Sequence, residues 1–126
     1  MLERDIQNKI LLTIGSRKDT RIFRQDVGNG WQGKVAQHME GRVILDFPRR
    51  VSYGLCRGSS DLIGWQTIEI TPDMVGKKVA RFVALEVKTP TGKVSPEQEN
   101  FINRVNDAGG KAGVVKSEEE AVSLLT

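Results

Sequence analysis

Hydrophobic residues at helical spacing open the chain and predict its first helix. The stripe consists of Leu2, Ile6, Ile10, Leu11 and Ile14. Residues three or four positions apart share one face of a helix, so residues 2–14 are expected to form an amphipathic helix that turns this stripe inward and ends at Gly15. Glu3 lies on the same face, where an acid is either a solvated residue at a frayed end or part of a site.

A second helical pattern, near the C-terminus, carries clear start and stop signals. Ser95 is a favourable N-cap, a proline follows at the first helical position, and Gln98 completes a capping box. The apolar face of this helix consists of Phe101, Ile102, Val105 and Ala108. The pair Gly109–Gly110 ends it. Residues 111–116 then predict a short strand, and Ser117 caps a last helix with three glutamates in its first turn.

Between these helices, alternating and apolar runs predict strands. The predicted strands and strand pieces cover residues 20–27, 43–47, 51–56, 61–64, 66–71 and 79–89. Residues 28–41 are rich in glycine and polar residues and are expected to form an excursion, and Pro48 is expected to end the strand before it. The order of elements predicts an α/β fold with a mixed central β-sheet flanked by helices, in a single domain over residues 1–126.

Composition excludes several classes of protein. With 38% hydrophobic and 28% charged residues, 126 residues can bury a core without disulfides. No apolar run approaches the roughly 20 residues of a membrane helix, and the charged N-terminus is unlike a secretion signal. One cysteine, Cys56, and one histidine, His38, are too few for a structural zinc site. A lone cysteine also fits a reducing, cytoplasmic location.

The charge is distributed unevenly. Residues 1–57 carry 11 Lys and Arg against 6 Asp and Glu, a net +5, whereas residues 58–126 carry 8 against 10, a net −2. A basic half can face phosphate groups while an acidic half holds cations. Ordinary fluctuation of composition is the alternative explanation.

The predicted strand over residues 79–89 contains the first candidate chemistry. Alternate side chains of a strand share a face, so Val83, Leu85 and Val87 are expected to point into a core, while Glu86 and Lys88 share the opposite face. Charges on a central strand are costly unless they are paired or bind something. A Glu–Lys ion pair without function is the alternative.

A second acid, Asp61, follows a Gly-Ser-Ser turn and precedes an apolar strand piece, 25 residues before Glu86. It can lie on the strand next to Glu86, or it can be an ordinary turn acid. Two carboxylates with a backbone carbonyl and waters suit Mg²⁺, which prefers oxygen ligands. A lysine beside them can orient water or stabilise phosphoryl charge. Gln98 falls on the inner face of its helix, although the capping box alone accounts for it.

In this order, the residues resemble the PD-(D/E)XK nuclease superfamily and, more closely, its virus-type replication-repair nuclease domain, VRR-NUC. The family pattern is a Glu on an N-terminal helix, a Gly-x-x-Asp strand, an E-V-K strand and an S-x-x-Q helix start. Here these motifs lie at Glu3, Gly58 to Asp61, Glu86 to Lys88, and Ser95 to Gln98. The resemblance runs from Glu3 to Leu125. It departs from the superfamily pattern at one position, because this chain has Ser60 where the superfamily has a proline before the Asp.

The resemblance implies a restriction-endonuclease-like core that hydrolyses DNA phosphodiesters with Mg²⁺ or Mn²⁺. The implied catalytic set is Asp61, Glu86, Lys88, Gln98 and Glu3. Asp61, Glu86 and the Val87 backbone carbonyl are the implied metal ligands, with Glu3 as a further candidate. Lys88 would position or polarise the attacking water, and Gln98 would orient Lys88 or that water.

The resemblance also implies partners. Small stand-alone members, as in phages, resemble Holliday-junction resolvases and act as homodimers, so the expected substrate is a four-way DNA junction in a bacterial or phage-infected cell. A flap or general DNA nuclease and a non-catalytic protein that binds branched DNA are the alternatives. Basic residues are candidates for contacts to DNA phosphates, namely Arg17, Lys18, Arg21, Arg24, Lys34, Arg49 and Arg50.

One competing motif suggests a different function. Residues 28–33 match the G-x-G-x-x-G fingerprint of dinucleotide-binding folds. The seven residues that follow are too few and too polar for the crossover helix that this fingerprint requires. We therefore expect no nucleotide cofactor.

Overall fold

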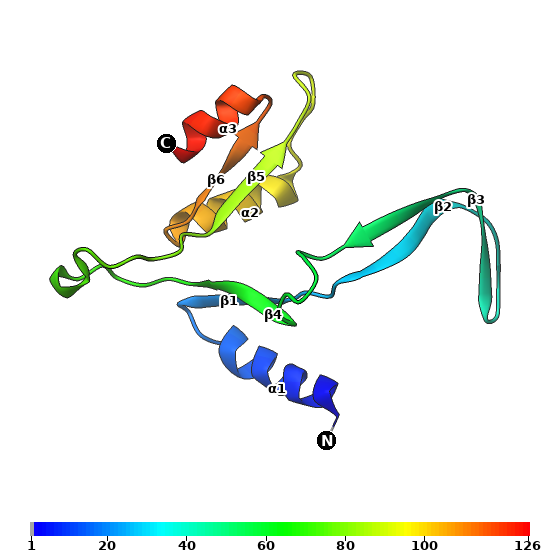
Figure 1. Ribbon diagram of the computed structural model, residues 1–126, viewed down its shortest axis with the longest axis horizontal. Coiled ribbons are helices and arrows are strands. Elements are labelled where there is room, and N and C mark those ends of the chain that lie inside the picture. Colours follow the sequence, from blue (N-terminus) through cyan, green and yellow to red (C-terminus); the bar gives the residue numbers. More distant parts are fainter. Residues whose placement is uncertain (1) are drawn as a thin grey trace. The chain divides into compact units, whose positions relative to one another are not determined.

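The computed structural model describes residues 2–126, which form three α-helices, six β-strands and one 3-10 turn (Figure 1). In chain order they are α1 (Glu3–Gly15), β1 (Thr20–Arg24), β2 (Gly28–Met39), β3 (Arg42–Tyr53), β4 (Leu62–Gln66), η1 (Pro72–Met74), β5 (Val83–Val87), α2 (Pro96–Asp107), β6 (Lys111–Val115) and α3 (Glu118–Leu125). The mixed α/β class is confirmed. Instead of one central sheet, the described residues form three two-stranded sheets, β1–β4, β2–β3 and β5–β6.

The chain divides into two compact units. The first comprises residues 2–16 and 22–64, and the second comprises residues 17–21 and 65–126. Strands β1 and β4 each contribute residues to both units. Whether the chain behaves as the expected single domain stays a prediction.

In the first unit, the predicted N-terminal helix is present, but the stripe that it half-buries is Gln7, Leu11 and Ile14. Leu11 and Ile14 are half-buried as predicted, whereas Ile6 and Ile10 are exposed, so the expected inward direction was wrong for those two isoleucines. The Arg24 guanidinium donates to Gln7 Oε1 at 2.5 Å and also to Asn8 Oδ1. This polar contact turns the Gln7 side of the helix toward β1.

The largest difference from expectation is the hairpin formed by β2 and β3. The segment predicted as an excursion pairs antiparallel with the following strand, from Gly28 opposite Tyr53 to Met39 opposite Arg42 (Figure 1). Pro48 does not end β3, because it lies at a register shift opposite residue 33, where a strand tolerates a missing N–H donor. The six-residue glycine motif therefore lies in an extended strand with no helix after it, so it lacks the geometry of a dinucleotide loop.

Strands β1 and β4 pair with each other, and one further backbone hydrogen bond lies just beyond each end of the pair. The Gln25 N–H donates to the Asp61 carbonyl at 2.8 Å, and the Thr67 N–H donates to the Asp19 carbonyl at 2.7 Å. The strand predicted over residues 66–71 does not form, since β4 ends at Gln66. The strand predicted over residues 79–89 is shorter than expected, since β5 covers only residues 83–87.

Among residues 2–126, the buried hydrophobic residues all belong to the second unit and are Val105 of α2 and Ala112 and Val115 of β6. Parallel strands β5 and β6 lie between α2 and α3 (Figure 1). As predicted, Ser95 Oγ accepts from the Gln98 N–H at the start of α2, and Gly109 (φ +97°) follows its end. Ser117 Oγ caps α3 in the same way, accepting from the Glu120 N–H.

The side-chain directions on β5 are opposite to the expected burial. Ala84 and Glu86 are half-buried on the face covered by α2, while Val83, Leu85 and Val87 are exposed, Val87 to 73%. The expected inward direction of these three residues was wrong. Helix α3 covers the other face only over β6, where an added Cβ on Gly113 would meet Leu124 at 3.0 Å.

Candidate active site

The candidate site begins with Glu86 near the end of β5. The strand is held in register by its pairing with β6, with Glu86 opposite Val114, and the Lys88 N–H extends the ladder to the Val115 carbonyl at 3.1 Å. Alternation along the strand turns Glu86 toward α2. The backbone that carries the carboxylate and the lysine is therefore fixed by the most buried part of the molecule.

Gln98 links the start of α2 to this carboxylate. Its Oε1 accepts from the Ser95 N–H at 3.0 Å, and its Nε2 donates to Glu86 Oε1 at 2.8 Å. Because a backbone N–H can only donate, it fixes which end of the amide is oxygen and leaves the NH₂ group for Glu86. The two interpretations of Gln98 from the sequence are thus compatible, since one side chain closes the capping box and also holds Glu86.

Lys88 reaches the same carboxylate oxygen. Its Nζ lies 3.4 Å from Glu86 Oε1, and the side chains are 22% and 30% exposed for Lys88 and Glu86 respectively. An ion pair open to water contributes at most about 1 kcal/mol to folding, so stability is a weak reason for two charges here. The Glu–Lys pair considered from the sequence is present, and its Glu86 lines a pocket.

A pocket of about 420 Å³ opens between β5 and the first turns of α2. Its lining residues are Ala84, Leu85, Glu86, Glu97, Gln98, Phe101 and Ile102. The pocket combines an apolar wall with a carboxylate, a combination typical of sites that orient a ligand by a few polar groups. The lining fits a polar substrate group held against Glu86.

The oxygen donors of this site fit a hard divalent cation. Both contacts of the Glu86 carboxylate converge on Oε1, and within residues 2–126 no hydrogen bond or ion pair involves Oε2. Oε2 can therefore coordinate a metal without displacing Gln98 or Lys88, and Val87 supplies the adjacent backbone carbonyl. Within either unit, however, no three Asp, Glu, His or Cys side chains of residues 2–126 gather into a cluster.

The other two predicted acids belong to the first unit. Asp61 directly precedes β4, its carbonyl accepts from the Gln25 N–H, and its side chain is exposed. Glu3 is exposed in the first turn of α1, where Gln7 Nε2 lies at hydrogen-bonding distance, 3.5 Å, from its Oε1. Their roles beside Glu86 stay predictions.

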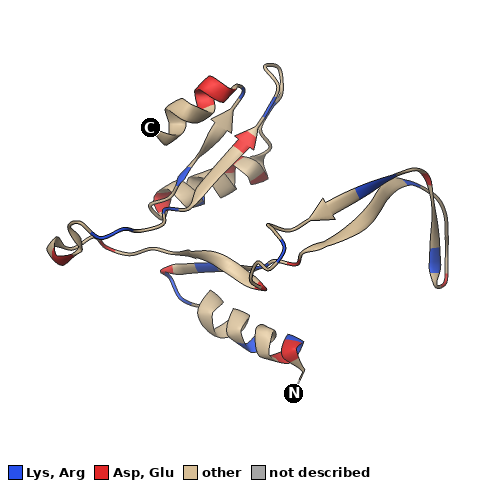
Figure 2. Cartoon of the chain, viewed as in Figure 1, with Lys and Arg blue, Asp and Glu red and all other residues tan. Residues whose placement is uncertain are grey.

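The predicted DNA-binding cations fall into separate groups. Arg17 pairs with Asp19 at 2.9 Å, and Arg24 is held by α1. Lys34 lies in β2, and Arg49 and Arg50 lie in β3; Figure 2 shows basic segments in blue along this hairpin. The Arg50 guanidinium lies 5.6 Å from the centroid of the Trp31 ring, which is 61% exposed.

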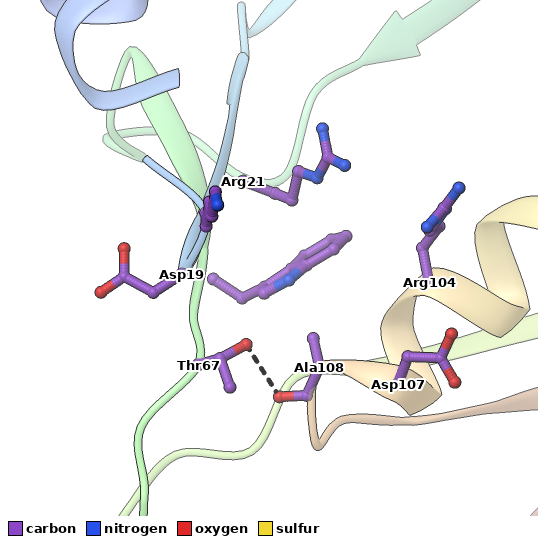
Figure 3. A pocket seen from close by; sticks show the side chains of 8 residues that line it. Asp19, Arg21, Thr67, Arg104, Asp107 and Ala108 are labelled. Atoms are coloured by element: carbon purple, nitrogen blue, oxygen red, sulfur yellow. Dashed lines mark hydrogen bonds between the residues drawn. The ribbon is translucent and has the colours of Figure 1, made fainter. Parts of the chain in front are cut away.

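A second pocket, of about 390 Å³, contains functional candidates that the sequence analysis missed. Arg104 and Asp107 of α2 and Trp65 of β4 line it together with Lys18 and Arg21 (Figure 3). Arg104 lies in the half of the sequence with a net charge of −2, where no basic cluster predicted a phosphate contact. Its place in the last turn of α2 also has a simple explanation, since a cation there complements the helix dipole.

Comparison with known proteins decides the family. The family model of the VRR-NUC domain matches residues 8–119. The chain belongs to the VRR-NUC family. The match confirms the resemblance; it includes Asp61, Glu86, Lys88 and Gln98 and leaves Glu3 outside.

A VRR-NUC domain implies a nuclease that acts on DNA, and the PD-(D/E)XK core is implied by the family. Searches of curated proteins and of solved structures gave no match. None of the helices within residues 2–126 has the length and apolar composition needed to span a membrane.

Proposed function

We propose that this VRR-NUC protein is a metal-dependent, structure-selective DNA endonuclease that resolves four-way junctions as a homodimer. The observation that carries the proposal is the arrangement at Glu86, whose Oε1 receives Gln98 at 2.8 Å and Lys88 at 3.4 Å in a pocket while Oε2 stays open. An acid, an amide and an ammonium group held together in this way fit phosphodiester hydrolysis.

Glu86, Asp61 and the Val87 carbonyl would hold Mg²⁺ or Mn²⁺, with Glu3 as a further ligand or a holder of metal-bound water. When bound, the cation supplies charge neutralisation at the phosphate and a more acidic water. The chain's own contribution is to fix the carboxylate. Because Gln98 and Lys88 both hold Oε1, Glu86 keeps one orientation and presents Oε2.

Lys88 has the second role. An ammonium group with three donors can hold Glu86 and still donate to a water or to a phosphate oxygen. It would position the attacking water and stabilise the negative charge that develops on the phosphoryl group. Gln98, held by the Ser95 N–H at the start of α2, would keep the Glu86 carboxylate in place and so orient Lys88, which contacts the same oxygen.

The basic residues would bind the DNA backbone. A two-stranded β-ribbon fits the major groove of duplex DNA, and the hairpin has Lys34, Arg49 and Arg50 along it. Arg17, Lys18, Arg21 and Arg24 would add phosphate contacts. Such contacts do not read sequence, which suits an enzyme that selects its substrate by shape.

Two features support a homodimer. An isolated two-stranded hairpin is marginally stable in water, yet β2 and β3 each extend over 12 residues and expose Phe47 to 91%. Val83, Leu85 and Val87 also leave an apolar face of β5 uncovered. A second copy would cover such surfaces, and two-fold symmetry would present two sites to a junction.

The test is cleavage of end-labelled four-way junction, 5′ flap and linear duplex with Mg²⁺, Mn²⁺ or EDTA. Paired cuts in the junction that disappear in EDTA and in Glu86→Gln are expected. Glu99→Gln is the matched control. Glu99 follows Gln98 in the first turn of α2, is exposed and does not line the pocket. Cuts mainly in the flap would keep the chemistry and change the substrate. Binding of branched DNA without any cleavage would favour the non-catalytic alternative.

A further inference from the structure

The pocket beside the C-terminal end of α2 brings three cations together from two separate segments. Lys18 lies two residues before β1, Arg21 belongs to β1, and Arg104 comes from α2. Figure 3 shows the Arg21 and Arg104 side chains extending toward the same open side of the pocket. The opposite side is closed by a hydrogen bond of 3.0 Å from Thr67 Oγ1 to the Ala108 carbonyl.

These three cations have no carboxylate partner within residues 2–126, where the ion pairs are Arg17–Asp19 and Lys88–Glu86. Asp19 lies at the same pocket, but its carboxylate is occupied by Arg17 at 2.9 Å and by the Thr20 hydroxyl at 2.9 Å. The Arg17 guanidinium lowers the pKa of Asp19 to about 2, so this acid stays ionised and engaged. Asp107 is the remaining acid of the lining, and the pocket keeps an excess of positive charge.

The apolar part of the pocket is an indole. The Trp65 ring packs on Phe82 with centroids 4.9 Å apart and on Phe101 at 6.1 Å, so aromatic neighbours hold it in place. A fixed flat ring next to guanidinium groups is suited to a nucleotide, because phosphate oxygens pair with arginine and a base or sugar rests on the ring. The volume of about 390 Å³ falls in the range of small-ligand pockets.

The pocket lies on the same helix as Gln98. Arg104 follows Gln98 by six residues, which is about 9 Å along a helix axis. A DNA strand advances about 3.4 Å per nucleotide, so the separation of the two residues along α2 corresponds to about three nucleotides of a strand.

We propose that this pocket binds one nucleotide of the DNA strand near the scissile phosphate, with its phosphate between Arg21 and Arg104 and its base or sugar against Trp65. This inference rests on the proposed nuclease function and assigns it a second contact that fixes where the strand is cut. Arg104 is a binding and positioning residue in this scheme.

The first experiment measures equilibrium binding of a labelled four-way junction, in EDTA, at several salt concentrations. Arg104→Gln is expected to weaken binding about tenfold and to lower the salt slope by about one. Arg81→Gln is the matched control, since it removes one exposed charge of the same unit outside the pocket. Equal effects of the two variants would overturn the proposal, because they would reveal only a general loss of charge.

The second experiment is expected to increase affinity, which a misfolded variant cannot do. Asp107→Asn removes the free carboxylate of the pocket and is expected to strengthen binding about threefold, whereas Glu119→Gln, an exposed acid of α3, changes it little. In a Trp31→Phe background, DNA should change the fluorescence of Trp65, the remaining tryptophan. The proposal that this pocket binds DNA would be overturned if Asp107→Asn left the affinity unchanged and DNA did not change the fluorescence of Trp65.

The position of the cut separates this proposal from the nuclease function itself. In Arg104→Gln, the cut is expected to spread over neighbouring phosphates, while the wild type cuts at one. Wild-type cleavage with unchanged binding and cut position in Arg104→Gln would overturn the pocket alone. A wild-type protein that binds DNA through Arg104 without cutting it would overturn the nuclease function and leave the pocket as a DNA-binding site.

Discussion

The hairpin β2–β3 and the sheet β5–β6 are both two-stranded, but they bury their side chains very differently. No residue of β2 or β3 is buried, whereas β6 contributes two of the three hydrophobic residues that are buried in the described part of the chain. The difference comes from the helices α2 and α3, which cover β5 and β6. A charged side chain can be held at a fixed place only where such a core fixes its backbone, and this is where Glu86 lies.

The hairpin has the opposite properties. Its Trp31 and Arg50 are exposed and contact each other, and Arg49 is held by Gln32 at 2.5 Å. A ribbon without a core can twist to follow a partner, which suits binding to DNA more than catalysis. Under the proposed function, the β5–β6 region would carry the chemistry and the hairpin would bind DNA, and substitutions in each region test this division.

The largest expected effect is on cleavage by the β5–β6 region. Lys88→Ala should lower the cleavage rate by a factor of about 10²–10⁴, because it removes the donor beside Glu86. Folding and DNA binding should change little, since Lys88 is at the strand end. Single-turnover cleavage, with binding and thermal melting measured in parallel, checks this; retained cleavage would refute the role of Lys88.

The next effect is on stability. Val105→Ala removes two methyl groups from a side chain that is 1% exposed and should lower the free energy of unfolding by about 2 kcal/mol. Val35→Ala makes the same change on the exposed hairpin and should cost no more than about 0.5 kcal/mol. Urea denaturation measures both. Similar losses would mean that a partner, such as a second copy, buries the hairpin.

A smaller effect is expected on DNA binding by the hairpin. Trp31→Ala should weaken junction binding about threefold to tenfold, because it removes a stacking surface and the partner of Arg50. Trp31→Phe should retain most of the affinity. Fluorescence anisotropy with a labelled junction measures the loss, and an Ala variant that binds like the wild type would exclude the hairpin from the DNA interface.

The smallest effect is on pH dependence in the second unit. The pKa of Asp19 falls from 3.8 to about 2, chiefly through its hydrogen bond with Arg17. A lowered pKa stabilises the folded state above pH 3.8, and this contribution is lost as the pH falls toward 2. Asp19→Asn should flatten the dependence of the urea midpoint between pH 5 and pH 2.5. An unchanged slope in the variant would show that other acids dominate.

Much of the candidate active site followed from local sequence. The capping box at Ser95 and Gln98, the glycines after α2 and the strand that carries Glu86 and Lys88 were predicted because each depends on neighbours within a few residues. The prediction failed on the direction of Val83, Leu85 and Val87. Apolar residues predict a buried face only if another element covers it, and α2 covers the other side.

The hairpin was predicted least well for a related reason. Glycines and polar residues weaken strand propensity, so residues 28–41 resembled a loop, and Pro48 resembled an end. Pairing with β3 overrides that propensity, and the register shift accommodates the proline. The pocket that contains Arg21 and Arg104 could not be predicted from the sequence either, because the two residues lie 83 positions apart.

The sequence by itself determined the chemistry available to this protein, because residue types and local spacing specify the acid, lysine and capping glutamine and the family pattern that they form. The tertiary structure alone decided how these groups meet. It placed Gln98 on Glu86, left one carboxylate oxygen open, and brought Arg104 to Lys18 and Arg21. Contacts between distant segments depend on which surfaces pack together, and that is a property of the folded chain rather than of any short stretch of it.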